Sequence, residues 1–258
     1  MRQYFLINIK NYGGALNHMI KKNKHYIEFV STIPGLSSIE ECVPKPAVKF
    51  IPTWWKEMKH VPSYHHIDEA VAGNVKNCPS FIDYFSQGYI LPMWADTILY
   101  YDDQTKDWSW RTSDPRFTYS NHNNDQYLDF SNHNFLGFDS YFIFKAHCPW
   151  RIITPPGYST YQIPTFYHFN KDFSVLPGIR DSDTYHQINP QILIHSNKKE
   201  IFIPRGTPLA QYIPFKRKQD HGIVRDASEK DMLEFQKNDL SFTTKFPGSD
   251  LYIKNRKK

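Results

Sequence analysis

Short runs of β-favouring, largely apolar residues, separated by polar segments with Pro and Gly turns, dominate the stretch from Cys148 to Phe215. Short strands at near-regular spacing indicate a small sandwich or barrel. Turns are marked at Thr154 to Gly157 and at Pro204 to Gly206. The predicted strands are Trp150–Thr154, Thr160–Thr165, Phe173–Gly178, Gln191–His195, Glu200–Ile203 and Ala210–Phe215.

The remaining pattern predicts a few short helices and further strands. Between Cys78 and Gly88, apolar positions recur every three to four residues, and Pro79 suits the first position of a helix. A second helix is predicted from Ser228 to about Lys237, burying Met232, Leu233 and Phe235 or Gln236. Further strands are predicted at Gln3–Ile9, Tyr89–Tyr101, Trp108–Arg111 and Gly137–Lys145, with a short helix over Ala15–Ile27.

Four prolines exclude a long helix between Ser31 and Met58, so this segment is predicted to be an extended arm that packs Trp54 and Trp55 on the core. No linker or repeat divides the chain. We therefore expect one domain, with an N-terminal elaboration and arm over residues 1–60, a β-rich core over 61–217, and a helix with a basic tail over 218–258.

Aromatic residues make up 16% of the chain, which favours strands and an aromatic core and argues against disorder. Trp108, Trp110, Tyr119 and Tyr127 lie among Asn and Asp residues, a mixture that fits an aromatic core under polar loops better than a stacking platform for sugars or bases.

The formal net charge of +5 is mild, and part of it comes from the basic tail and from Lys216, Arg217 and Lys218, so we do not expect nucleic acid as a partner. Three cysteines without a CxxC motif indicate a reducing compartment. No stretch approaches the roughly 18 apolar residues of a membrane span. The N-terminal residues lack the features of a secretory signal peptide, so we expect neither secretion by a signal peptide nor membrane association.

The segment GIRDSDTY, followed by the strand Gln191–His195 and by IPRGTPLAQYIPF, resembles part of the deoxyuridine triphosphatase (dUTPase) family. In that family an Asp contacts the deoxyribose 3′-hydroxyl and positions the attacking water, and a Tyr stacks under the sugar. The resemblance implies these roles for Asp181 or Asp183 and for Tyr185. Arg180 and Arg205 are further candidate ligand-binding residues, which would favour a nucleotide if they line a pocket with the acidic residues. Gly206, Ala210 and Gln211 match the later strand of the family pattern.

The resemblance departs from the dUTPase family in ways that bear on the reaction. Arg180 replaces an apolar residue, and neither the Arg-Ser-Ser phosphate-binding segment nor the glycine-rich C-terminal arm of the family is present. Phosphoryl chemistry needs donors around the phosphates and usually a metal ion. The same residues, Asp181 to Asp183, also suit a structural turn, because short polar side chains bond to nearby backbone.

Twelve histidines offer a second candidate site. His66 and Asp68 form a His-x-Asp pair, His195 lies in a predicted strand, and Arg205 follows ten residues later. Two histidines and one carboxylate are the ligands of non-haem iron oxygenases. In the 2-oxoglutarate-dependent family, which this spacing resembles, a basic residue about ten positions after the distal His binds the cosubstrate.

A wider set of motifs, including PAVKFIPTWWKEM, KNCPSFIDYFSQGYILPMWAD and HCPWRIITPPGYSTY, resembles uncharacterised proteins of tailed phages and some bacteria. The resemblance implies a phage origin, with a location in the host cytoplasm or the virion. We expect a mainly β protein with a single jelly-roll or dUTPase-like barrel or sandwich and a few short peripheral helices.

Because no complete catalytic constellation is recognised, we favour a non-enzymatic structural, assembly or ligand-binding protein. A dUTPase-like nucleotide hydrolase or binder and a non-haem iron oxygenase remain alternatives. Self-association or binding to virion proteins is expected, a nucleotide remains a candidate ligand, and no cofactor is assigned.

Overall fold

The computed structural model describes residues 27–59, 64–65, 70–71, 74–105, 107–121, 142–196, 198–218 and 222–244. The chain divides into two compact units. The first consists of Met1–Pro44 and Tyr89–Arg217, and the second of Lys45–Gly88 and Lys218–Lys258.

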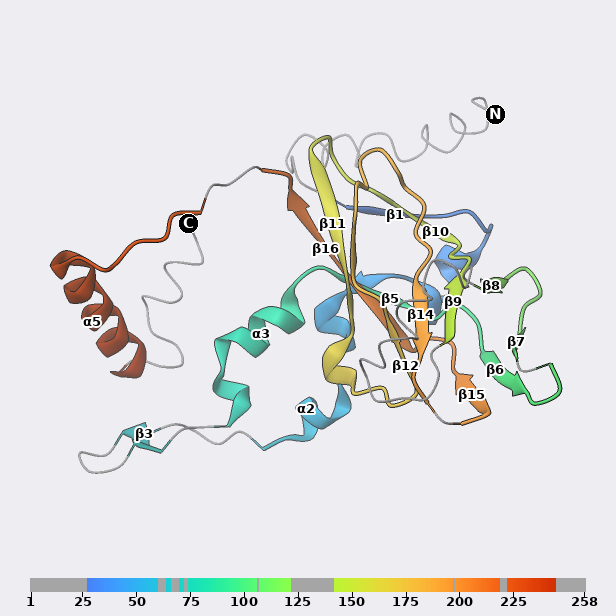
Figure 1. Ribbon diagram of the computed structural model, residues 1–258, viewed down its shortest axis with the longest axis horizontal. Helices are drawn as coiled ribbons and strands as arrows, with labels where there is room; N and C mark the ends of the chain where they lie inside the picture. Colours follow the sequence, from blue (N-terminus) through green and yellow to red (C-terminus); the bar gives the residue numbers. More distant parts are fainter. Residues whose placement is uncertain are drawn as a thin grey trace. The chain divides into compact units, whose positions relative to one another are not determined.

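The first unit contains several antiparallel sheets (Figure 1). One sheet of this unit has the strand order β13-β11-β16-β5, a second has β12-β14-β9-β8, a third has β15-β6-β7, and β1 pairs with β10. The strands are β1 (Glu28–Ser31), β5 (Tyr89–Pro92), β6 (Thr97–Asp102), β7 (Asp107–Thr112), β8 (Tyr119–Asn121), β9 (Phe142–Ala146), β10 (Trp150–Ile153), β11 (Tyr158–Pro164), β12 (Phe173–Val175), β13 (Gly178–Arg180), β14 (Gln191–Ile194), β15 (Glu200–Ile203) and β16 (Pro208–Lys216). The short helices η1 (Leu36–Ser38), η2 (Glu40–Cys42) and η5 (Phe166–His168) complete it.

The pairing of β11 with β16 determines which side chains meet at the end of this sheet. Ser159 lies opposite Phe215. The Arg217 N–H donates to the Gly157 carbonyl at 2.8 Å, which continues the pairing beyond the strand ends. Side chains two positions apart share a face of a strand, so Ser159 and Arg217 project on the same side of the sheet. On the other edge of β11, Thr160 pairs with Arg180, which brings Asp181 opposite Ser159.

The sheets enclose an apolar core that is rich in aromatic rings. Phe144 on β9 is fully buried, and its ring centroid lies 4.7 to 6.4 Å from the centroids of four neighbouring rings. These rings belong to Trp108, Trp110, Tyr119 and Phe142. Trp108, Trp110 and Tyr119 are thus part of the core rather than a stacking platform, while Tyr127 lies outside the described residues.

All three cysteines are free. Burial raises the pKa of Cys148 to about 12, and burial also raises the pKa of Cys42. Because the thiolate is the reactive form of cysteine, neither residue is a nucleophile near neutral pH.

The second unit contains the short helices and strands η3 (Ala47–Phe50), α2 (Thr53–Glu57), η4 (Val75–Asn77), α3 (Pro79–Ser86), β2 (Lys45–Pro46), β3 (Tyr64–His65) and β4 (Ala70–Val71), and the longer helix α5 (Glu229–Thr244). Trp55 stacks on Phe81 with ring centroids 5.6 Å apart and meets Phe85 edge-on at 5.0 Å. The predicted helix after Cys78 is confirmed, with Pro79 at its start.

The structure differs from the sequence prediction in three places. The segment predicted to run extended holds short helices, because Pro46 and Pro52 precede the first turns of η3 and α2 rather than blocking them. The strands predicted over Tyr89–Tyr101 and Phe173–Gly178 are each interrupted, the second at Leu176 and Pro177. In α5, Met232, Leu233 and Phe235 are exposed rather than buried. The strand and helix predicted before residue 27 lie outside the described residues.

The predicted fold class is confirmed: the protein is mainly β, with antiparallel sheets and few helices. The described strands form open sheets rather than a closed barrel. In the described part of the chain, no helix combines the length and the apolar character needed to cross a membrane. The division into segments 1–60, 61–217 and 218–258 stays a prediction.

Candidate functional site

The acidic turn from Asp181 to Tyr185, which the sequence points to most strongly, follows β13. The Asp181 carbonyl accepts the N–H groups of Thr184 at 3.1 Å and Tyr185 at 2.8 Å, which closes the turn. The structure therefore brings Asp181 and Asp183 together, and Tyr185 lies exposed at the end of the turn.

Arg217, beyond the end of β16, joins the two carboxylates of this turn. Its Nη1 donates to Asp181 Oδ1 at 3.1 Å and to Asp183 Oδ1 at 2.9 Å, and its Nη2 donates to Asp183 Oδ2. Asp181 also accepts from Ser159 Oγ at 2.6 Å, and Asp183 accepts from the Gly157 N–H at 2.8 Å. These bonds occupy both oxygens of Asp183 but only one oxygen of Asp181, whose side chain is 62% exposed.

The electrostatics of the turn agree with a structural role. The Asp183 side chain is only 6% exposed. Hydrogen bonds from Arg217 and from the Gly157 N–H lower the pKa of Asp183 to about 2, and the bond to Asp183 in turn raises the pKa of Arg217. A carboxylate with so low a pKa is a weak general base at neutral pH, because a base works best with a pKa near the working pH.

The other predicted site residues lie in structural positions. The Arg180 guanidinium donates to the carbonyls of Gln187 at 3.2 Å and Asn189 at 3.3 Å, so it anchors the following loop. Arg205 lies in the turn between β15 and β16, where its N–H donates to Asp96 Oδ1 at 2.8 Å. Neither of these hydrogen bonds involves the acidic turn, and a role of the two arginines in ligand binding stays a prediction.

The metal candidates cannot be assembled from the described residues. His66 and Asp68 lie outside them, so the iron-binding triad with His195 stays a prediction. In the part of the chain that the structure describes, no group of three or more His, Cys, Asp or Glu residues could hold a metal ion. His195 instead lines a pocket that the sequence pattern did not reveal.

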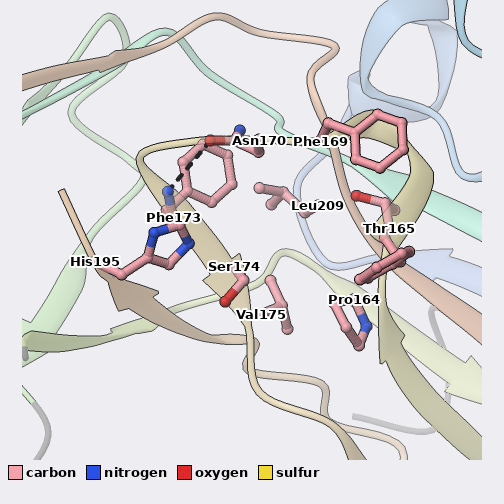
Figure 2. A pocket seen from close by; sticks show the side chains of 10 residues that line it. Pro164, Thr165, Phe169, Asn170, Phe173, Ser174, Val175, His195 and Leu209 are labelled. Atoms are coloured by element: carbon pink, nitrogen blue, oxygen red, sulfur yellow. Dashed lines mark hydrogen bonds between the residues drawn. The ribbon is translucent and has the colours of Figure 1, made fainter. Parts of the chain in front are cut away.

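This pocket has a volume of about 410 Å³ and lies between the end of β11, the turn η5 and the strand β12 (Figure 2). Its floor is apolar, because Phe173, Val175 and Leu209 belong to the buried core. The residues that line it are Pro164, Thr165, Phe166, Phe169, Asn170, Phe173, Ser174, Val175, His195 and Leu209. A volume of this order fits a small-molecule site, which typically combines apolar walls with a few polar groups.

Two aromatic rings that line the pocket are largely exposed to solvent. Phe166 is 64% and Phe169 55% exposed, and their ring centroids are 6.1 Å apart in an edge-on arrangement. Phe169 ends η5 with φ 49° and ψ 43°, the left-handed conformation that a bulky side chain rarely adopts. A residue in this conformation commonly ends a helix, and here it caps η5 through the Phe169 N–H, which donates to the Phe166 carbonyl.

The backbone conformation of Phe169 leads to a testable prediction about stability. Phe169→Gly should leave the free energy of unfolding within about 1 kcal/mol of wild type, because glycine adopts the left-handed region without steric cost. Phe169→Ala should be the less stable variant by about 1 kcal/mol, since it keeps the left-handed penalty and loses the ring. Urea unfolding of both variants measures the difference, and equal stabilities would contradict the left-handed conformation.

The polar side chains that line the pocket are few, and His195 is the one ionisable side chain among them. Asn170 Oδ1 accepts the N–H groups of Asp172 at 3.0 Å and Phe173 at 3.2 Å, and Thr165 Oγ1 donates to the Pro208 carbonyl at 3.2 Å. The lining set contains no Asp, Glu, Lys or Arg. The pocket therefore suits a neutral ligand rather than a phosphorylated one.

Comparisons with known proteins identify no family for this chain. No family model matches it, and no curated protein matches it. Among solved structures, a native EIAV dUTPase aligns with a TM-score of 0.30 and 13% identity, covering 66% of this chain and 96% of that chain. At this identity and TM-score the likeness supports no statement about activity.

Proposed function

We propose that the protein is a non-enzymatic ligand-binding protein whose binding site is the pocket between β11, η5 and β12. The observation that carries the proposal is the pair of exposed rings, Phe166 and Phe169, above a buried apolar floor. Exposed aromatic side chains at a concave site offer large contact area at little conformational cost, which is what a binding site requires.

The contrast with the acidic turn supports a binding role over nucleotide hydrolysis. Asp181 and Asp183 already accept hydrogen bonds from Arg217, Ser159 and Gly157, and these carboxylates are the groups that dUTPase-like chemistry would need. The dUTPase-like hydrolase is therefore the weaker proposal. We also propose that the protein comes from a phage and that it has a role in the virion or in its assembly. Both proposals rest on the resemblance of its sequence motifs to uncharacterised phage and bacterial proteins.

A ligand screen with matched variants tests the proposal. Thermal shift followed by calorimetry of uncharged aromatic compounds, sugars and nucleotides should yield a ligand that raises the melting temperature. Phe166→Ala should weaken its binding by about tenfold, a typical loss for one stacking contact. The control is Phe202→Ala on β15, which removes a ring of similar exposure, 56%, outside the pocket.

Two results would overturn the proposal. The first is that no compound in the screen raises the melting temperature, or that Phe166→Ala and Phe202→Ala bind alike. The second is turnover of a nucleoside triphosphate that Asp183→Asn abolishes, since that would place a reaction at the acidic turn.

A further inference from the structure

The pocket runs along the open edge of β12. This strand is the outermost one in the order β12-β14-β9-β8. Phe173 and Val175 are buried in the core while Ser174 between them is half-buried, yet all three line the pocket (Figure 2). Because adjacent residues of a strand point to opposite faces, a pocket lined by all three lies at the strand's edge.

The register of β12 fixes which backbone groups face this edge. The His195 N–H donates to the Asp172 carbonyl at 3.1 Å, and the Leu176 N–H donates to the Gln191 carbonyl at 2.9 Å. In an antiparallel pair, alternate residues direct both backbone groups to the partner strand, and those between them direct both away. The N–H and C=O of Phe173 and Val175 therefore face away from β14.

Of these four outward groups, the Phe173 N–H donates to Asn170 Oδ1 at 3.2 Å. The other three are the Phe173 carbonyl and the N–H and carbonyl of Val175, and the first two of these form an adjacent acceptor and donor. The Phe173 carbonyl and the Val175 N–H are separated by one residue and point the same way along the edge. A ligand that carries a donor beside an acceptor matches this pair.

The side chains that line the pocket determine which charge and shape of ligand it can bind. The rings of Phe166 and Phe169 favour a planar partner, since aromatic faces stack on flat π systems. A cationic group would lose its hydration without finding a carboxylate among the lining residues, and an anionic group would find neither Lys nor Arg there. Phosphates in particular need cationic or clustered N–H donors.

We propose that the pocket takes an uncharged planar heterocycle with a hydrogen-bond donor beside an acceptor, as in a cyclic amide. Its N–H donates to the Phe173 carbonyl, its carbonyl accepts from the Val175 N–H, and its ring packs against Phe166 and Phe169. This inference rests on the proposed function and adds the chemical class of the ligand.

The test compares three small probes by calorimetry on the full chain: quinolin-2(1H)-one, its N-methyl derivative and quinoline-2-carboxylate. The first has the donor and the acceptor, the second lacks the donor, and the third carries a charge. We expect quinolin-2(1H)-one to bind, N-methylation to weaken binding about tenfold because the Phe173 carbonyl is left unpaired, and the carboxylate to bind no more tightly. The Val175 amide resonance should shift on binding.

The variants separate failure of this inference from failure of the proposed function. Phe169→Gly should weaken binding of quinolin-2(1H)-one, and Phe202→Ala should not. Suppose that Phe169→Gly weakens binding of quinolin-2(1H)-one. If the N-methyl probe then binds as well as the parent, or if the carboxylate binds more tightly, the proposed ligand class is wrong. The pocket remains the binding site in either case. If no probe binds, or both variants behave alike, the pocket is overturned as well.

Discussion

Phe144→Ala should lower the free energy of unfolding by about 3–5 kcal/mol, the usual cost of removing a fully buried aromatic ring. Phe144 lies at the centre of the aromatic core and contacts rings from β7, β8 and its own strand, so no single neighbour can fill the space it leaves. Because domains are stable by only about 5–15 kcal/mol, this variant should be close to unfolding.

Denaturant unfolding followed by near-ultraviolet circular dichroism measures this effect. Phe202→Ala is the matched control, because its ring on β15 is exposed and surface changes typically stay within about 0.5 kcal/mol. Phe144→Leu, which keeps most of the volume, should cost less than Phe144→Ala and remains measurable if the alanine variant does not fold. Similar stabilities for Phe144→Ala and Phe202→Ala would contradict the position of Phe144 in the core.

Arg217→Gln should lower the melting temperature by several degrees at neutral pH, because it leaves the shielded Asp183 carboxylate without its cation. Replacing both partners, as in Arg217→Gln with Asp183→Asn, should recover much of the loss, since two neutral amides leave no unpaired charge. A double-mutant cycle of melting temperatures measures this coupling. If the double variant loses as much melting temperature as the two single variants together, Arg217 and Asp183 do not interact directly.

The same contact predicts a loss of stability in acid. The pKa of Asp183 is lowered to about 2 in the folded protein, against about 4 for an unfolded chain. The folded state then binds fewer protons than the unfolded state, so its stabilisation is complete above pH 4 and is lost as the pH falls towards 2. Wild type should lose more stability over this window than Asp183→Asn. If wild type and Asp183→Asn lose the same stability between pH 4 and pH 2, the pKa of Asp183 is not lowered in the folded protein.

Elements with strong local signals could be predicted from the sequence. The helix after Cys78 has Pro79 at its start and apolar residues at helical spacing, and the strand Glu200–Ile203 is a short apolar run that ends at the turn of Pro204 to Gly206. In both cases the information lies within a few neighbouring residues. The breaks in two predicted strands depend on tertiary packing, which local patterns do not encode.

The candidate sites could be predicted less well, because they depend on contacts between distant residues. Arg217 occurs in a basic run that resembles a solvated cluster, and only the register of β11 with β16 shows that it meets Asp183. The pocket joins Phe166, Ser174 and His195 from separate elements. The sequence marked Asp181 and Asp183 as candidate site residues, but it could not show that Arg217 binds both.

The most direct test of the account is an amide chemical-shift map of the full chain with a bound ligand from the screen. If the pocket is the binding site, the largest changes should fall on Thr165 to Val175 and on His195, with little change from Arg180 to Tyr185. The opposite pattern, with the largest changes at the acidic turn and none along β12, would contradict the proposed binding site.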